Sequence, residues 1–352
     1  PHTPHPTRFW PRDSPDWLMV LFVIWGGVSL LFAQRFGVAA REFRVVVAES
    51  VVWFWLVRHS GLAARERRRL VDALLLSATL VAMYGLYQWV WTADIIQAEG
   101  VRRIRAVYGS PNNLSLLLER VLPIAGAVAL LAPRSGRRFW YGVAIVPLAA
   151  ALFLTFSRGS WLLGVPAGLL WLAWWGGARA RRWVAVIVVV GLLALLPFGA
   201  TERVRGVLDL ESSTSSIRLA LWQATGEMLE DYPVLGVGLD NFLYAYDSYR
   251  LPEAWREPDL SHPHQIILHF WVALGLPGVA LLIGQQVAFW RAWIRVERKV
   301  PKQSLARALL VGLGASMGAT LAHGMIDNAY FLVDLAFIWM LTMALVGELS
   351  EE

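Results

Sequence analysis

Residues 183–198 read WVAVIVVVGLLALLPF and contain no charged side chain. An α-helix rises about 1.5 Å per residue, so about 20 such residues cross the hydrocarbon core of a bilayer, which is about 30 Å thick. Continuous hydrophobicity with scattered Gly and Pro is typical of a helix, whereas a transmembrane barrel would show shorter segments of alternating hydrophobicity. The stretch therefore predicts a membrane-spanning helix over residues 182–199.

Apolar runs of the same kind predict nine more membrane helices. They cover residues 17–34, 43–57, 70–91, 113–132, 139–156, 159–176, 265–290, 304–325 and 329–348. The expected fold class is all-α, a polytopic membrane helix bundle of about ten transmembrane helices with one long external loop. Residues 1–199 would supply about seven helices, residues 200–263 the loop and residues 264–352 about three helices, together forming one functional unit. The proline-rich residues 2–17 are expected to be a disordered lead-in.

The composition excludes most soluble classes of protein. Hydrophobic residues make up 57% of the chain and charged residues 16%. Soluble domains carry about 25% charged residues, so this chain has too little polar surface to cover a water-soluble globule. The absence of Cys excludes a disulfide framework, thiolate nucleophiles and Cys-ligated metal sites. Arginines in cytoplasmic loops explain the net charge of +6, so we expect membrane lipids and no nucleic acid as partners.

The distribution of basic residues predicts the orientation in the membrane. Most of them lie in alternate connections, after the second, fourth, sixth and eighth predicted helices, and the lead-in adds Arg8 and Arg12. The remaining short connections carry far fewer: Arg35, Arg41, Arg44, Arg102, Arg103, Arg105 and Arg158. Because cytoplasmic loops are enriched in Lys and Arg, both termini are expected in the cytoplasm and the loop 200–263 outside.

Two arginines stand out on the expected external side. Arg158 lies in the tight turn 155–161, where hydrocarbon meets water, so a partner is expected for it; the alternative is an arginine bound to lipid phosphate. In the external loop, Arg218 and Trp222 share one face of a helical stretch at i,i+4 spacing. A guanidinium suits phosphate oxygens, although Arg218 alone could also be a solvated charge.

Two further polar segments are predicted on the same side. His262 and His264 flank a proline where the loop re-enters the membrane, and an imidazole can accept a proton from a hydroxyl near neutral pH. They could instead bind a metal, but no acidic ligand stands nearby at a suitable spacing. Ser110 and Pro111 predict a helix N-terminus, which attracts anions, just after three arginines; the alternative is a purely structural cap.

Arginines and one histidine at an external membrane interface suit a lipid-anchored phosphate or pyrophosphate substrate. Residues 100–345, which contain these polar segments, resemble the O-antigen ligase/polymerase superfamily of membrane glycosyltransferases (the Wzy_C type). The resemblance rests on the order and spacing of five elements: Arg105–Asn113, Ser157–Gly159, the helix with Arg218 and Trp222, Pro233–Phe242, and the set His264, Gln265, Gly275 and Gly278.

The resemblance implies a metal-independent, inverting glycosyltransferase without cofactors, in the bacterial cytoplasmic (inner) membrane with its active site on the periplasmic side. It would move a glycan from an undecaprenyl-pyrophosphate carrier to lipid A core, another surface glycan or a protein. By this resemblance Arg158 and Arg218 would hold the pyrophosphate, and His264 would take the proton of the acceptor hydroxyl. The implied substrate-binding residues also include Arg105, Asn112, Asn113, Trp222, His262 and Asp327, and Asp327 with Asn328 could orient the site.

Two alternatives remain open. An O-antigen polymerase of the same superfamily is the first, but polymerases are associated with an Arg-x10-Gly motif, and no external arginine here has Gly eleven positions later. A lipid or solute transporter is the second, because a ten-helix bundle is expected to bury several charged residues: Glu49, Glu119, Arg120, Asp327 and Asp334. Transporters usually show two related halves, and none is visible in this sequence.

Overall fold

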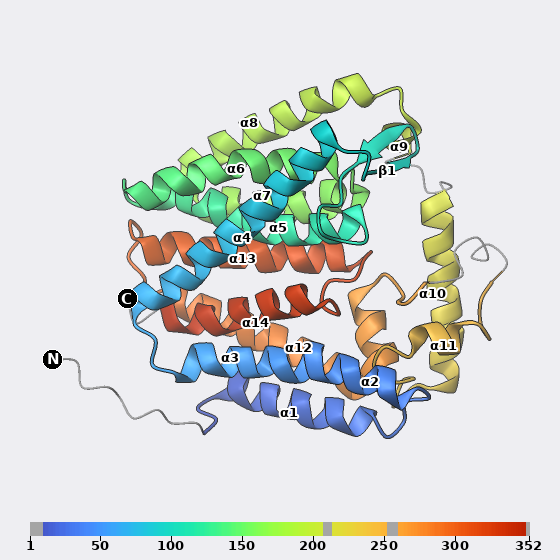
Figure 1. Cartoon of the computed structure of the whole chain (residues 1–352). Helices are drawn as coiled ribbons and strands as arrows, with labels where there is room; N and C mark the ends of the chain where they lie inside the picture. The colour runs from blue at the N-terminus through green and yellow to red at the C-terminus, as the bar shows by residue number, and fades with distance from the viewer. Residues whose placement is uncertain (1–9, 207–212, 252–259, 350–352) are drawn as a thin grey trace. The chain divides into compact units, whose positions relative to one another are not determined.

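A computed structural model describes residues 10–206, 213–251 and 260–349, and it confirms the all-α fold class (Figure 1). The elements in chain order are α1 (Ser14–Ser29), α2 (Phe36–Glu42), a π-helix (Phe43–Ala48), α3 (Glu49–His59), α4 (Ala64–Trp91), β1 (Ile96–Ala98), β2 (Val101–Arg103), α5 (Pro111–Leu131), α6 (Gly136–Leu154), a π-helix (Ser160–Gly164), α7 (Val165–Trp175), α8 (Gly177–Leu195), a 3-10 turn (Leu196–Phe198), α9 (Glu202–Arg205), α10 (Ser213–Asp231), α11 (Phe242–Tyr246), α12 (Ile266–Glu297), α13 (Leu305–Gly324) and α14 (Val333–Glu348). The strands β1 and β2 form an antiparallel pair.

Every predicted membrane span corresponds to a helical segment. Within the described part of the chain, six helices are long and apolar enough to cross a membrane: α4, α5, α6, α8 with its 3-10 extension, α12 and α13. Residues 14–29 and 160–175 form shorter apolar helices. The lead-in prediction is wrong at its end, because α1 begins at Ser14, where the Asp13 side chain accepts a hydrogen bond from the backbone of Asp16. Residues 1–9, with Arg8, lie outside the described residues.

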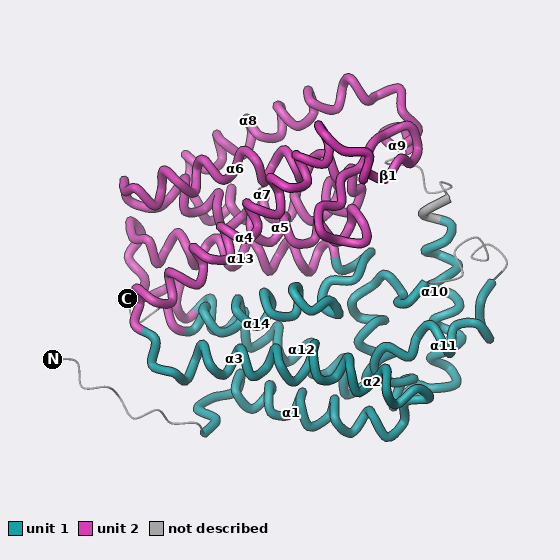
Figure 2. The backbone as a smooth tube through the Cα atoms, viewed as in Figure 1, with its two compact units in different colours: residues 1–62, 210–294, 324–347 teal, residues 63–209, 295–323, 348–352 magenta. Residues whose placement is uncertain are grey.

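The described residues form two compact units that interleave along the sequence (Figure 2). Unit 1 comprises residues 1–62, 210–294 and 324–347, and unit 2 comprises residues 63–209, 295–323 and 348–352. Unit 1 therefore holds α1–α3, α10, α11, α14 and most of α12. Unit 2 holds α4–α9, both strands and α13.

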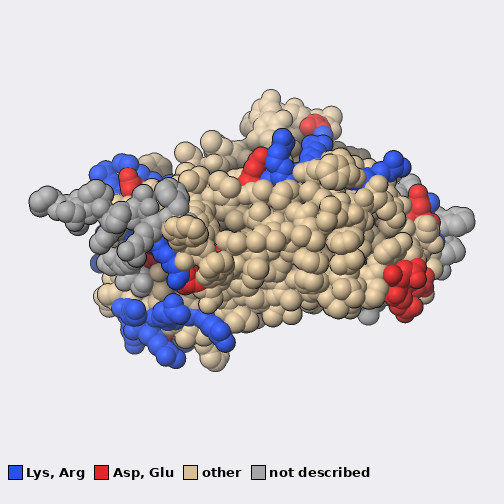
Figure 3. Space-filling view, turned by 90° about the horizontal axis from the view of Figure 1, so that it is seen from below, with Lys and Arg blue, Asp and Glu red and all other residues tan. Residues whose placement is uncertain are grey.

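Unit 1 combines a helix bundle with a smaller apolar cluster. In the bundle, the Trp25 indole donates to the carbonyl of Leu274 at 2.7 Å, and the Trp339 indole donates to Gln285 at 3.0 Å. The smaller cluster joins α10, α11 and Val272 of α12 through a buried apolar core. A face of the molecule is largely uncharged, and charged side chains gather toward its ends and upper edge (Figure 3), as expected for helices surrounded by lipid.

Unit 2 is built around α5, most of which is buried, whereas the apolar stretch of α8 has no buried residue. Glu119 and Arg120 of α5 are each 1% exposed, which confirms the prediction that they face the interior. Glu49, in contrast, is not a buried charge: its side chain is 51% exposed and lies 3.5 Å from Arg44. Asp334 is only partly buried, so two of the five charges predicted to be buried are not.

Candidate functional site

Four of the predicted site residues meet in unit 1 around one buried carboxylate. Asp327, in the turn between α13 and α14, is 2% exposed. His264 Nδ1 lies 2.8 Å from Asp327 Oδ1, and His262 Nε2 lies 4.0 Å from the same oxygen. Arg218 of α10 places its Nη2 atom 3.7 Å from Asp327 Oδ2. Three segments that are distant in the sequence thus meet at the side chain of Asp327.

The hydrogen bond between His264 and Asp327 determines what the imidazole can do. A carboxylate that accepts from Nδ1–H keeps the proton on that nitrogen, so Nε2 carries the free lone pair. The carboxylate also stabilises the imidazolium that forms when Nε2 takes a proton. His264 is therefore oriented as a general base, with 21% of its side chain exposed.

The backbone around His264 is held in an uncommon conformation. His264 has φ +48°, in the left-handed region that non-glycine residues rarely adopt. The Trp222 indole donates to the carbonyl of Pro263 at 2.9 Å, and Gln265 Oε1 accepts from the Leu268 backbone at 2.6 Å at the start of α12. Such strain persists where the surroundings over-determine it, often at functional sites. Trp222 thus positions the histidine segment, and its predicted substrate contact stays a prediction.

The glycine of the histidine motif has a structural reason. Gly275 has φ +67° and ψ −168°, so it kinks α12. A Cβ atom at this position would lie 1.9 Å from the carbonyl oxygen of Val234. At the kink the backbone of Leu276 donates to Val234 at 3.0 Å, and Val237 donates to Val272 at 2.7 Å. The glycine at position 275 therefore lets the segment 234–237 dock on α12.

Burial lowers the pKa of His262, the neighbouring His264 lowers it further, and Asp327 opposes both effects. The rings of His262 and His264 lie 4.2 Å apart between centroids. Because His262 is disfavoured as a cation, Arg218 is the permanent positive charge beside Asp327. His269 is 6% exposed, and its ring lies 4.1 Å from that of Phe331 between centroids, so it is a packed core histidine.

Two histidines and one carboxylate also form a possible metal site. Ligand atoms of His262, His264 and Asp327 all lie within 4.8 Å of one another. The sequence argument against a metal relied on the lack of a nearby acidic ligand, and that argument is wrong, because Asp327 supplies one from another segment. Such a ligand set suits several divalent cations. The guanidinium of Arg218 beside the same carboxylate opposes a further positive charge.

Arg158 lies in unit 2, in a second cluster around Glu99. Arg158 Nη2 donates to Glu99 Oε2 at 2.6 Å, and Arg158 Nε donates to the carbonyl of Arg203 at 3.3 Å. Arg203 Nη1 lies 3.3 Å from both carboxylate oxygens of Glu99. Both arginines are buried, so the expectation that Arg158 has a partner is confirmed.

One nitrogen of the Arg158 guanidinium makes no hydrogen bond to the rest of the described protein. This nitrogen, Nη1, is buried and has no hydrogen-bond partner among the described residues. A Cβ atom at Gly206 would lie 2.6 Å from Nη2, so a larger residue there would displace the guanidinium. Because Nε and Nη2 are bound to the protein, Nη1 is the nitrogen that can donate to an added anion.

The segment with Arg105, Asn112 and Asn113 also belongs to unit 2. Ser110 caps α5 and accepts from the backbones of Asn112 at 3.1 Å and Asn113 at 3.4 Å, which confirms the predicted helix start. The Asn112 side chain accepts from Arg103 at 2.9 Å. Arg105 pairs with Asp94 at 2.5 Å, so its charge is already balanced and its donor-binding role stays a prediction.

The predicted site residues thus fall into two groups, each within one unit. Arg218, Trp222, His262, His264 and Asp327 belong to unit 1; Arg105, Asn112, Asn113 and Arg158 belong to unit 2. That both groups serve one substrate stays a prediction. Sequence reasoning missed Glu99 and Arg203. The Glu99-Gly100 turn between two short extended segments is a sequence signal that could have indicated Glu99.

A family model described as O-antigen ligase matches residues 124–283, somewhat under half of the chain, including Arg158, Arg218 and His264. No curated protein matches. A chain from the solved structure titled "Structural coordination of polymerization and crosslinking by a peptidoglycan synthase complex" is similar over 96% of each chain, with 16% sequence identity and a TM-score of 0.48. The family match confirms the resemblance that the motifs predicted: this multi-pass membrane chain carries the O-antigen ligase-like region of the O-antigen ligase/polymerase superfamily.

Proposed function

We propose that this chain transfers a glycan from an undecaprenyl-pyrophosphate carrier to an acceptor hydroxyl at the external face of the bacterial cytoplasmic membrane, as an O-antigen ligase-like enzyme. The observation that carries the proposal is the His264–Asp327 hydrogen bond beside Arg218, inside a chain matched by the O-antigen ligase family. A base that is oriented by a carboxylate and lies next to a fixed cation suits attack by a hydroxyl on a substrate with an anionic leaving group.

The reaction follows from the roles of these groups. The acceptor oxygen attacks the anomeric carbon, and its proton passes to Nε2 of His264 as the new glycosidic bond forms. The bond between that carbon and the pyrophosphate oxygen breaks, and undecaprenyl pyrophosphate leaves with the electron pair. A single displacement of this kind inverts the anomeric configuration.

Arg218 and Arg158 would stabilise the leaving group. Guanidinium groups bind phosphate oxygens through paired hydrogen bonds, and charge that develops on the pyrophosphate strengthens this interaction in the transition state. The free Nη1 of Arg158 supports this role for the unit 2 cluster. The acceptor is proposed to be lipid A core, another surface glycan or a protein.

The proposal is tested with purified protein, an undecaprenyl-pyrophosphate glycan and candidate acceptors. Wild type should release undecaprenyl pyrophosphate and glycosylate an acceptor, and His264→Ala and Arg218→Ala should lose both products while keeping the wild-type melting temperature. Single additions to a separate acceptor support a ligase, whereas ladders on the lipid carrier would make the chain a polymerase. A His264→Ala variant with full rate would overturn the mechanism.

A chelator decides between a metal-free site and a metal site. The charge of Arg218 favours the metal-free reaction, so the rate should persist in EDTA. A rate that EDTA removes and one divalent cation restores would instead assign a metal to His262, His264 and Asp327.

A further inference from the structure

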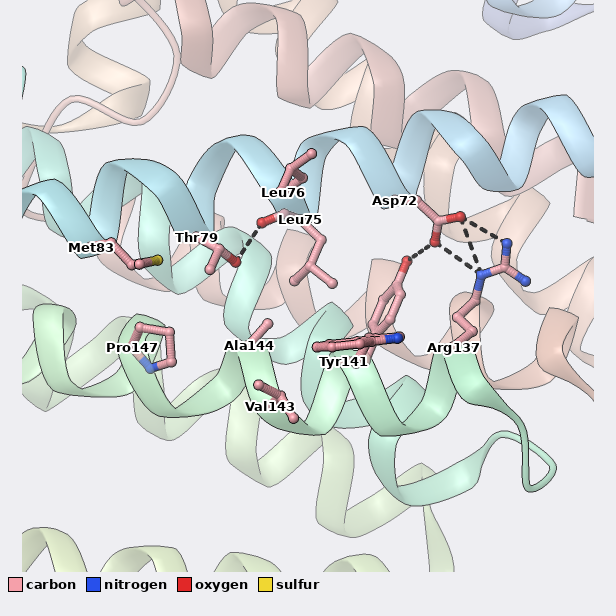
Figure 4. Close-up of a pocket in the computed structure, with 11 residues that line it drawn as sticks. Asp72, Leu75, Leu76, Thr79, Met83, Arg137, Tyr141, Val143, Ala144 and Pro147 are labelled. Atoms are coloured by element: carbon pink, nitrogen blue, oxygen red, sulfur yellow. Dashed lines mark hydrogen bonds and ion pairs between the residues drawn. The ribbon is translucent and has the colours of Figure 1, made fainter.

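A groove of about 500 Å³ runs between α4 and α6 of unit 2 (Figure 4). Its size lies within the range of ligand pockets, about 300–1,000 Å³. The residues that line it come from these two helices: Asp72, Leu75, Leu76, Thr79, Met83, Arg137, Trp140, Tyr141, Val143, Ala144 and Pro147. Both helices are long and apolar enough to cross a membrane, so we expect the groove to face lipid.

The groove is polar at one end and apolar along the rest of its length. At the polar end Arg137 binds Asp72 through two nitrogens, at 2.8 and 2.9 Å, and the Tyr141 hydroxyl donates to Asp72 at 2.8 Å (Figure 4). The one hydroxyl farther along, that of Thr79, donates to the Leu75 carbonyl at 2.7 Å. Apart from the indole N–H of Trp140, the remaining side chains of the wall are apolar, so its chemistry matches an amphiphile with one chain in the groove.

The positions on α4 show that arginines continue the groove beyond its polar end. Residues 65, 69, 72, 76, 79 and 83 recur at spacings of three and four, which places them on one face of the helix. The last four of these line the groove, and the first two are Arg65 and Arg69. Both arginines are exposed, as is Arg134, which precedes the first turn of α6.

The charge at this end favours an anion. Asp72 is balanced by Arg137, so Arg65, Arg69 and Arg134 add positive charge that this ion pair does not offset. The connections at this end are the arginine-rich ones that the sequence assigns to the cytoplasm. Anionic phospholipids of that leaflet gain about 1 kcal/mol for each Lys or Arg near the surface.

We propose that this groove binds an anionic phospholipid, with an acyl chain between α4 and α6 and its headgroup near Arg69 and Arg134. The groove runs from Asp72 to Met83 of α4 and from Arg137 to Pro147 of α6, whereas Arg158 follows the end of α6. The lipid site is therefore separate from the residues assigned to glycan transfer, and it stands whether or not the chain transfers a glycan.

The test measures lipid binding directly. Delipidated protein in detergent is titrated with phosphatidylglycerol or phosphatidylethanolamine, and bound lipid is counted by native mass spectrometry. Wild type should retain phosphatidylglycerol preferentially. Arg69→Gln with Arg134→Gln should weaken that retention about fivefold for each arginine removed, and phosphatidylethanolamine binding should change little.

A second variant tests the groove itself. Thr79→Trp fills it and should lower the retention of both lipids, whereas Leu80→Trp adds the same bulk at an exposed neighbouring position outside the groove and should change neither. Equal binding of the two lipids by wild type would overturn the headgroup assignment. Full retention by a folded Thr79→Trp variant would overturn the groove as the site. The arginine variant keeps the proposal testable if Thr79→Trp does not fold.

Discussion

The clusters around Asp327 and Glu99 both place one carboxylate among several basic side chains, yet they differ in what remains free. Asp327 is almost fully buried and orients His264, whose side chain is partly exposed. Glu99 is 24% exposed and binds two buried arginines, leaving one nitrogen of Arg158 without a partner. In the proposed reaction, the first arrangement would supply the base for proton transfer, and the second would supply a fixed positive charge for the anionic leaving group.

The largest expected effect separates these two roles. His264→Ala should lower kcat by about 10²–10⁴-fold, because proton transfer by a positioned base contributes about that much, while the KM for the lipid-linked glycan changes little. Arg158→Ala should instead raise the KM for that donor as well as lower kcat. Steady-state kinetics with purified protein measures both parameters.

Arg102→Ala is the matched control for Arg158→Ala. Arg102 lies on the hairpin that carries Glu99, the partner of Arg158, but it is exposed and stacks over Trp89, so its loss should leave the kinetics near wild type. If His264→Ala and Arg158→Ala changed kcat and KM in the same proportions, the division of roles between the two clusters would be refuted.

The second effect concerns the Asp327 carboxylate. Asp327→Asn should lower kcat by about 100-fold or more, because the amide cannot stabilise the imidazolium of His264. Asp327 Oδ1 accepts from His264 and from the Asn328 backbone, and Oδ2 faces Arg218. In one orientation of the replacement side chain, the amide nitrogen would face the two N–H donors at the Oδ1 position. In the other orientation, it would face the Arg218 guanidinium at the Oδ2 position. A melting curve should show whether the variant folds, and a folded variant with the wild-type rate would exclude an orienting role for Asp327.

Sequence reasoning succeeded where a pattern is local. Apolar runs predicted the helices, and Ser110 predicted the start of α5. The motif that contains His264 and Gly275 is recognised from its spacing, and the kink of α12 explains why it needs Gly275. Sequence reasoning failed where partners are far apart in the chain. Glu99 and Arg203 are 104 positions apart, and no periodicity joins them. Asp327 was predicted to orient the site, but no pattern could specify that His264 is its partner.

The third effect breaks the Glu99 cluster. Glu99→Gln keeps one acceptor but removes the charge shared by Arg158 and Arg203, so the protein should lose about 1–2 kcal/mol of unfolding free energy. Removing one partner of a fully buried pair costs about 3–5 kcal/mol, and partial exposure of Glu99 reduces this cost. The donor KM should rise, because Arg158 is no longer held with Nη1 free.

Asp94→Asn provides the comparison for that variant. Asp94 pairs with Arg105 in the same unit, but its side chain is 52% exposed, and exposed pairs contribute little. Thermal unfolding followed by tryptophan fluorescence should therefore separate the two variants. Equal melting temperatures would show that the Glu99 cluster is no stronger than a surface ion pair.

The smallest effect tests how pH acts on the Asp327 cluster. Burial lowers the pKa of His262 in the folded state, so between the unfolded and folded pKa values the unfolded chain binds more protons. The stabilising contribution of neutral His262 is present above pH 6.5 and is lost as the pH falls below that value. His262→Gln, which cannot titrate, should lose less melting temperature than wild type between pH 7.5 and pH 5.5. His264, Asp327 and Arg218 surround His262 and remain in the variant, so the difference between the two slopes of melting temperature against pH isolates His262. Equal slopes would mean that folding does not lower the pKa of His262.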